Sequence, residues 1–338
     1  MTDFLNALVI IANFIMSPGL AYGSQLALGA LGVTLVFGVL RFSNIAHGET
    51  MAAGTMFTML VTWLLQSMGI GFGPLPTALL ALPFGIGAAM VLCLATDRAG
   101  LWLLPAGQGA SSAIYIIVSV GVMFVYNGLI RFVVGPQDRN FTDGQRFIMK
   151  ARAFKHMTGL NEGLAIKTTQ AVSLGCAVLA VGIVFWFLNR TRTGKSMRAF
   201  SDNEDLALLS GINPDRVVMI AWMMTAALAT IAGTLYGLDK SFKPFVYLQL
   251  LLPIFAAAIV GGVGNPLGAI AGGFVIAFSE LFVTFAYKRV VTYMVPESMA
   301  PEGLVQILST DYKFAVSFMI LVIVLLVKPT GIFSGKSL

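Results

Sequence analysis

The chain has 338 residues, of which 57% are hydrophobic and 11% are charged, and its formal net charge is +6. An ordinary soluble domain carries about 25% charged residues, so the charges here are too few to cover a water-facing surface. The composition therefore excludes a soluble enzyme, a nucleic-acid-binding domain and a disordered chain, and it indicates a polytopic membrane protein.

Apolar runs long enough to cross a bilayer recur along the chain. A hydrocarbon core about 30 Å thick needs ~20 apolar residues per helix, and these runs lack the alternation of β-barrel strands. We therefore predict an all-α integral membrane protein in one domain over 1–338, a polytopic helical bundle of about eight membrane segments with broken or re-entrant helices. The predicted apolar segments are 4–16, which is too short to span comfortably, and then 19–40, 51–68, 75–95, 111–131, 168–188, 217–237, 251–285 and 312–328.

A polar interruption at 41–50 separates the second of these segments from the third, and it contains Asn44, His47, Gly48 and Glu49. Irregular backbone at membrane depth is tolerated only where protein or water covers it, and ionisable groups there are costly. Asn44, His47 and Glu49 could contact a polar substrate or hold the broken backbone together by hydrogen bonds, and we favour the second role. Gly48 is a further candidate for the break or the path. A plain turn at the membrane surface is the alternative.

Two polar segments, 132–167 and 189–216, are separated by one predicted span, so they lie on opposite sides of the membrane. Both are rich in Lys and Arg, and charge alone does not orient the chain. The second segment contains the signals of a short amphipathic helix: an acidic first turn after a capping residue, apolar residues on one face, and a terminal glycine. These residues are Asp202, Asn203, Glu204, Leu206, Leu209, Gly211 and Ile212. The helix could lie on lipid headgroups or dock another subunit.

The apolar run 251–285 would be ~52 Å long as one helix, which is too long for a single crossing. Gly262, Gly264 and Asn265, followed by a proline, indicate two pieces joined by a tight turn within 261–268. Glu280 lies in the second piece at membrane depth, where it could bond a neighbouring helix or line a path.

Glycine pairs with GxxxG spacing occur at Gly19/Gly23, Gly233/Gly237 and Gly268/Gly272. Such pairs allow helices to approach closely, and packing within this chain is their expected use.

The chain contains no complete nucleotide-binding motif. A P-loop requires a glycine, four further residues and then Gly-Lys-Ser/Thr, whereas Asn189 and Thr330 stand at the position of the first glycine in the two near matches. The two histidines are far apart and the two cysteines lie in apolar runs, so neither a metal site nor a catalytic set is indicated. We expect a transport protein that is not an enzyme and holds no cofactor.

The segment 194–216 resembles the cytoplasmic coupling loop of ABC importer permeases, specifically the branched-chain amino acid family of LivH and LivM type. Four further stretches are similar to family motifs in order: FSNIAHGE at 42–49, AALATIAGTL at 226–235, AAIVGGVGNPLGA at 257–269 and KPTGI at 328–332. The chain is most similar to the LivH-like subunit.

The sequence departs from the family pattern in three places. Residues 101–108 replace a segment that is usually basic, and 132–167 and 288–310 are longer than expected. These departures leave the substrate and the external docking surface open.

The resemblance implies a permease subunit of an ABC importer for branched-chain or related amino acids, in a bacterial cytoplasmic (inner) membrane. The implied partners are a second, LivM-like permease, two cytoplasmic ATPase subunits that hold ATP and Mg, and a soluble substrate-binding protein. It also implies that 189–216 is cytoplasmic and that 132–167, 238–250 and 286–311 face outward. The helix at 202–211 would dock an ATPase subunit.

A stand-alone channel or facilitator for a small polar solute, such as urea or an amide, is the alternative function. The breaks at Asn44 and Asn265 are compatible with a pore of half-helices, but a pore has no need of a docking helix. In the importer we expect Asn44–Glu49 and Gly261–Gly268 to line or flank one translocation path near the interface with the partner permease, because lipid cannot satisfy their exposed backbone groups.

Overall fold

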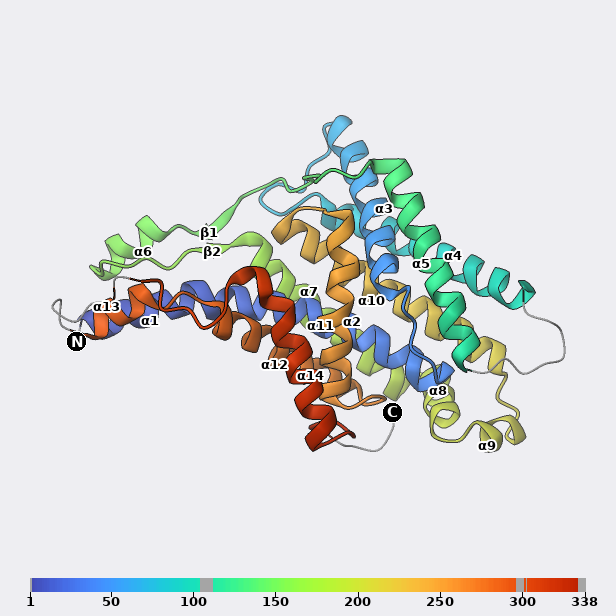
Figure 1. Cartoon of the computed structure of the whole chain (residues 1–338). Coiled ribbons are helices and arrows are strands. Elements are labelled where there is room, and N and C mark those ends of the chain that lie inside the picture. Colours follow the sequence, from blue (N-terminus) through green and yellow to red (C-terminus); the bar gives the residue numbers. More distant parts are fainter. Residues whose placement is uncertain (1, 104–111, 296–300, 302, 334–338) are drawn as a thin grey trace.

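A computed structural model describes residues 2–103, 112–295, 301 and 303–333, and it shows a helical bundle with a projecting arm (Figure 1). Seven helices in these residues are long and apolar enough to cross a membrane, and Val246–Gly261 forms a shorter apolar helix. The predicted fold class is therefore confirmed. The bundle helices are α2 (Ser17–Leu40), α3 (His47–Ser67), α4 (Ala78–Leu103), α5 (Ser112–Val134), α7 (Thr168–Arg190), α10 (Pro214–Lys240), α11 (Pro244–Gly261), α12 (Pro266–Thr284) and α14 (Lys313–Val327).

The predicted separation of 4–16 from 19–40 is wrong. Helix α1 (Thr2–Ile11), a π-helical turn (Ala12–Met16) and α2 follow one another as one 39-residue run. Pro18 would clash with the carbonyl group four residues before it in a regular helix, and the wider π turn directly before α2 relieves this clash. The run is about 58 Å long, so its N-terminal part extends beyond a hydrocarbon core of about 30 Å.

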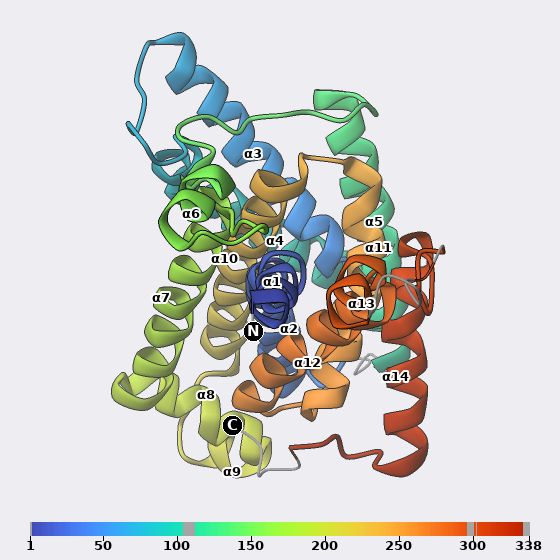
Figure 2. The same cartoon turned by 90° about the vertical axis from the view of Figure 1, so that its left-hand side faces the viewer.

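Helix α2 lies at the centre of the bundle. Figure 2 shows α1 and α2 nearly end-on, with α7 and α10 on one side and α11 and α12 on the other. Glycines allow the close contact with α12: a Cβ atom on Gly23 would lie 2.5 Å from the Phe274 ring, and one on Gly273 would lie 2.6 Å from the backbone of Ala27. The predicted glycine pairs at 19/23, 233/237 and 268/272 all pack within this chain.

Helices α11 and α12 form the hairpin that the sequence predicted. Gly262 and Gly264 have positive φ angles of 102° and 86°, which suit glycine. The side chain of Asn265 then accepts a hydrogen bond from the Gly268 N–H and caps α12. The predicted loop at 238–250 is wrong, because α10 continues to Lys240 and only 241–243 separate it from α11.

The stretch between α5 and α7 and the stretch that begins after α12 fold together with α1 into the arm at the left of Figure 1. The predicted loop 132–167 begins only after α5 ends at Val134, and it contains β1 (Phe147–Met149), α6 (Ala151–Thr158) and β2 (Ile166–Lys167). The other stretch contains α13 (Lys288–Met294), which packs along α1.

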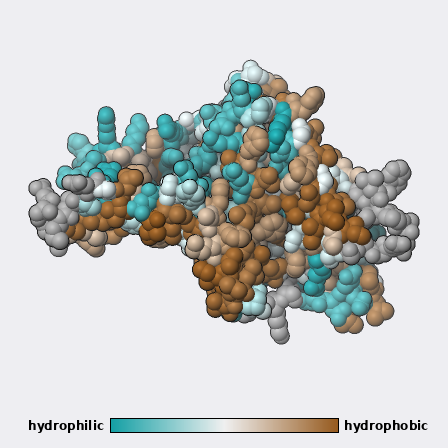
Figure 3. Space-filling model, in the orientation of Figure 1, coloured by the Kyte–Doolittle hydropathy of each residue, from teal (hydrophilic) through white to brown (hydrophobic). Residues whose placement is uncertain are grey.

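Glu162 joins the three parts of the arm. Its N–H donates to Asn6 Oδ1 over 3.1 Å, and its carboxylate accepts from Arg289 Nη2 over 2.7 Å and from Tyr293 Oη over 3.1 Å. Figure 3 shows hydrophilic side chains on the upper side of the arm and hydrophobic ones along parts of its lower side. The arm segments thus pack along one side of the part of α1 that extends beyond the bundle, and Phe4, Leu5 and Leu8 stay exposed.

The α11–α12 contact provides a direct test of this packing. A Cβ atom on Gly272 would lie 2.1 Å from the Ala257 carbonyl oxygen, whereas one on Gly182 of α7 would meet nothing within 4 Å. Gly272→Ala should therefore destabilise the protein by about 1–3 kcal/mol through overpacking. The matched change Gly182→Ala should leave stability unchanged or raise it by up to about 1 kcal/mol, because alanine favours helix. Thermal unfolding of the two variants in detergent measures this difference, and equal midpoints would contradict the packing.

Candidate functional site

The first break in the bundle is shorter than predicted. Helix α2 ends at Arg41, which has a φ of 57°, and α3 already begins at His47. His47, Gly48 and Glu49 therefore form the first helical turn of α3, and the irregular backbone is confined to 41–46. Asn44 stabilises this stretch because its Oδ1 accepts a hydrogen bond from the Ala46 N–H over 3.0 Å.

The first turn of α3 is held between α2, α5 and α11. His47 is 1% exposed, and its ring occupies the place of a side chain on Gly32 of α2. A Cβ atom on Gly48 would lie 2.6 Å from the Tyr247 carbonyl oxygen of α11. Glu49 is fully buried, and its Oε1 accepts from Asn127 Nδ2 of α5 over 2.7 Å.

Two polar atoms at this turn have no hydrogen-bond partner among the described residues: His47 Nε2 and Glu49 Oε2. A buried group of this kind is costly unless water or a ligand reaches it. The turn therefore combines a tightly packed frame with unused hydrogen-bonding capacity.

A small cavity of about 70 Å³ opens beside the break. Its lining includes Asn44, Thr50 and Ser119, together with Asp97 at the end of α4. On the side of the 189–216 segment lies a larger cavity of about 940 Å³, which also has Asp97 in its lining and extends to Arg216 at the start of α10. The first break thus lies next to two cavities, and the larger one reaches the 189–216 segment.

Three aromatic side chains belong to the lining of both cavities: Phe42, Tyr115 and Trp222. The rings of Phe42 and Tyr115 are stacked with centroids 5.3 Å apart, and the Phe42 and Trp222 rings are 6.4 Å apart. Sequence reasoning missed Tyr115 and Trp222, and it also missed Asp97 and Ser119, whereas Phe42 opens the FSNIAHGE motif that it identified. Asp97 lies two residues after the predicted apolar run 75–95 and was an ionisable signal that could have led to this cluster.

The second break, at 262–265, lies elsewhere. Its turn is covered by the C-terminal segment, because Asn265 Nδ2 donates to the Phe333 carbonyl oxygen over 2.9 Å and the Ile332 N–H donates to Val260 O over 2.8 Å. Gly48 contacts α11 near Tyr247, whereas the turn follows the opposite end of α11, about 21 Å further along the helix. The structure does not bring the two breaks together.

Glu280 connects two helices of the bundle. It is 1% exposed, and its carboxylate accepts a hydrogen bond from Ser317 Oγ of α14. Its backbone oxygen also accepts from Thr284 Oγ1 over 2.7 Å. Glu280 does not line either cavity at the first break.

The 189–216 segment contains two helices where the sequence predicted one over 202–211. These are α8 (Arg192–Asp202) and α9 (Glu204–Leu209). Asn203 is the residue that caps α9, since its side chain accepts from the Leu206 N–H over 3.0 Å, whereas Asp202 ends α8. Gly211, with a φ of 78°, follows the helix as predicted.

The apolar residues of α9 divide into two groups. Ala207 is buried with Met197 and Phe200 of α8, and Ile212 packs against the same cluster. The leucines face away: Leu206 is 60% exposed and Leu209 is 85% exposed. One face therefore anchors α9 to the bundle, and the other presents apolar surface.

Helix α8 is bonded directly to the end of α2 at the first break. Arg41 donates to the Ser201 carbonyl oxygen, and Ser201 Oγ donates to the Gly38 carbonyl oxygen over 2.8 Å. The polar segment and the break are therefore mechanically connected.

Comparisons with known proteins agree with the resemblance seen in the motifs. Residues 15–325 match the family described as "Branched-chain amino acid transport system / permease component". The high-affinity branched-chain amino acid transport system permease protein LivH of Escherichia coli K12 is 29% identical over 94% of both chains. The corresponding protein BraD of Pseudomonas aeruginosa is 25% identical over 93% of both chains.

The similarity extends to a permease that is named for a different substrate. The ribose import permease protein RbsC of Escherichia coli K12 is 25% identical over 75% of this chain and 72% of its own length. Since the family match extends over nearly the whole chain, the protein belongs to the family of permease components of branched-chain amino acid transport systems, and it is LivH-like.

Proposed function

We propose that this chain is the LivH-like permease subunit of an ATP-driven importer for branched-chain or related amino acids in the bacterial cytoplasmic membrane. The chain acts as a single permease domain and forms the translocation path with a second, LivM-like permease. Two cytoplasmic ATPase subunits bind ATP and Mg, and a soluble binding protein delivers the substrate from outside. This chain itself binds neither nucleotide nor metal.

The connection between α8 and the first break carries the mechanism. In the proposed orientation the segment 189–216 is cytoplasmic and the arm is external. The exposed leucines of α9 dock an ATPase subunit, and α8 transmits its movement through Ser201 to Gly38 and Arg41. The break is the part of α2–α3 that can change conformation with the smallest loss of helical hydrogen bonds, so movement there opens or closes the adjoining cavities.

The two cavities form the inner part of the path. Asn44, Asp97 and Ser119 supply polar groups beside the break, and a zwitterionic amino acid needs such groups because lipid cannot solvate its charges. The rings of Phe42, Tyr115 and Trp222 stand between the small cavity and the large one and act as the inner gate. The second break, with Gly262, Gly264 and Asn265, is assigned a structural role as the covered turn of the α11–α12 hairpin.

Docking through α9 predicts a specific loss of coupling. Leu209 is 85% exposed in this chain, and we expect the docked ATPase subunit to bury it. Leu209→Glu places a charge in that contact and should weaken ATPase binding by about tenfold or more. Substrate-stimulated ATP hydrolysis in the reconstituted complex should fall accordingly, with membrane insertion unchanged. Met157→Glu is the matched control, because Met157 is 82% exposed but lies on α6 in the arm. Normal stimulation in the Leu209 variant would refute the docking role.

The inner path predicts state-dependent access from water. Ser119→Cys, in a chain from which Cys93 and Cys176 have been removed, should react with a small charged thiol reagent, and trapping ATP in the partner subunits should change the rate. Val178→Cys is the control, because Val178 is 67% exposed on α7. We expect this surface to face lipid, which a charged reagent does not enter. A Ser119→Cys variant that stays unreactive in every state would place the path elsewhere.

A further inference from the structure

A second polar pocket, of about 630 Å³, lies at the opposite end of the bundle from α8 and α9. It is formed where α7 begins, where α10 ends and where the chain passes from 140 to 146. Its lining includes Thr142, Arg146, Lys167, Thr169, Asp239 and Lys240. In the proposed orientation this pocket faces outward.

Asp239 is the centre of the pocket, and its side chain is only 6% exposed. Lys167 Nζ lies 3.7 Å from one carboxylate oxygen and Lys240 Nζ lies 3.5 Å from the other. Thr169 Oγ1 is also 3.5 Å from the first oxygen. Charge-assisted hydrogen bonds are usually about 2.7–2.9 Å long, so all three contacts are loose and a bound ammonium group can approach more closely.

A neighbouring ion pair shows the contrast. Lys243 Nζ lies 2.6 Å from Asp138 Oδ2, and both side chains are exposed. That pair is in direct contact and lies outside the pocket lining. The carboxylate of Asp239, in contrast, is buried, and no lysine among the described residues lies closer to it than 3.5 Å.

The remaining charges of the pocket favour a ligand that also carries a carboxylate. The other acid in the lining, Asp143, is already used: one oxygen accepts from the Thr77 N–H over 2.7 Å and the other from Gln66 Nε2 over 2.9 Å. Lys167 and Lys240 therefore share a single available carboxylate. Arg146, whose guanidinium lies 5.4 Å from the Phe147 ring centroid, adds positive charge to the lining. An ammonium group on Asp239 would release the lysines to bind an anionic group on the same ligand.

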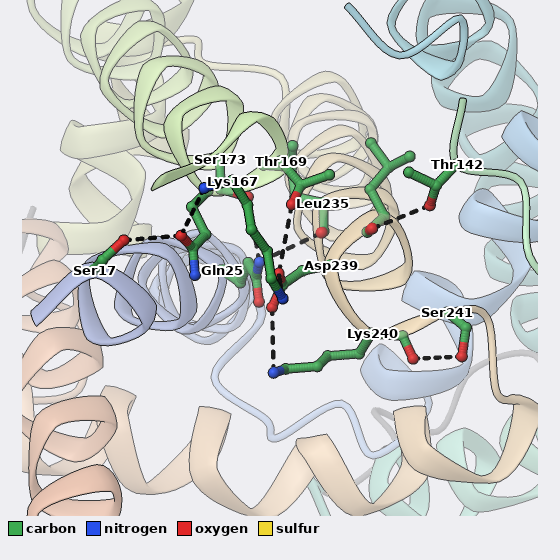
Figure 4. Close-up of polar contacts among 12 residues, drawn as sticks. Ser17, Gln25, Thr142, Lys167, Thr169, Ser173, Leu235, Asp239, Lys240 and Ser241 are labelled. Carbon is green, nitrogen blue, oxygen red and sulfur yellow. Dashed lines mark hydrogen bonds and ion pairs between the residues drawn. The ribbon is translucent and has the colours of Figure 1, made fainter. Parts of the chain in front are cut away.

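Buried polar side chains continue from the pocket into the bundle, and Figure 4 shows them converging from α2, α7 and α10. Gln25 Nε2 donates to Ser173 Oγ over 3.3 Å and to the Leu235 carbonyl oxygen over 3.4 Å. Ser17 Oγ donates to Gln170 Oε1 over 2.8 Å. Polar residues at membrane depth are expensive. These hydrogen-bonded side chains, which we call the polar column, extend the polar surroundings of the pocket toward α2.

We propose that the outer pocket binds the α-ammonium and α-carboxylate groups of an amino acid, with Asp239 on the ammonium and Lys167 and Lys240 on the carboxylate. The inference rests on the proposed function, because it assigns the substrate's zwitterionic part to a site on this chain. Only Pro76 and Leu238 contribute larger apolar surface to the lining. The pocket therefore binds the α-ammonium and α-carboxylate groups that all amino acids share, and it distinguishes their side chains weakly.

Protection from a thiol reagent tests the site. Thr142 lies in the lining and is exposed, so Thr142→Cys, with Cys93 and Cys176 removed, should react with a membrane-impermeant maleimide in the assembled complex without binding protein. Millimolar leucine, isoleucine and valine should slow this reaction to similar extents. Leucinamide, which lacks the carboxylate, and 4-methylpentanoate, which lacks the ammonium group, should not. Thr158→Cys on α6 is the control position, and its rate should not change with any of these compounds.

Asp239→Asn keeps the shape of the side chain and removes its charge. It should weaken protection by leucine and raise the transport KM by about tenfold or more, because hydrogen bonds to charged groups are the strong ones. Lys243→Gln breaks the ion pair between Lys243 and Asp138 outside the pocket. It should leave the protection by leucine and the transport KM unchanged. Basal ATP hydrolysis in the Lys243→Gln variant should equal that of the parent chain.

The outcomes separate the pocket from the proposed function. Absence of protection by leucine, equal protection by 4-methylpentanoate, or an Asp239→Asn variant that behaves like the parent chain overturns the pocket assignment while ATP-driven uptake persists. A complex that shows no ATP-driven uptake overturns the proposed function itself.

Discussion

The close packing of α2 against its neighbours is the contact on which the rest of the structure depends. Lipid is as apolar as leucine, so membrane helices associate through close approach rather than through a hydrophobic driving force. Side chains of other helices occupy the space beside the α2 glycines: Phe274 beside Gly23, Ile254 beside Gly29, and His47 beside Gly32. These contacts fix α2 in the centre and place the first turn of α3 at the same time.

One rigid helix consequently connects the two polar sites. Gln25 lies in the polar column beside the pocket around Asp239, and Arg41 caps the same helix at the first break. The arm extends this axis in the other direction, because Asn6 and Glu162 join α1 to the stretch 135–167. A movement at α8 therefore acts on a helix that reaches both ends of the bundle, and the proposed function uses this helix to couple the two polar sites.

The sequence predicted the features that depend on local chemistry. Glycine and proline marked the α11–α12 turn, and Asn203 and Gly211 marked the ends of α9. It could not predict features that depend on distant partners. The continuity of α1 and α2 needs a π turn before Pro18, and the arm needs residues from three parts of the chain. The cavity lining of Asp97, Tyr115 and Trp222 comes from three helices whose approach no local pattern encodes.

ATP-dependent uptake of radiolabelled leucine tests the central claim most directly. The complex of this chain with its partner permease and ATPase subunits would be reconstituted into proteoliposomes with the cognate binding protein outside. The proposed function predicts accumulation of leucine above its external concentration that requires both ATP and the binding protein. Equilibration of leucine, urea or a small amide at the same rate without ATP would contradict this account, because it would identify a channel.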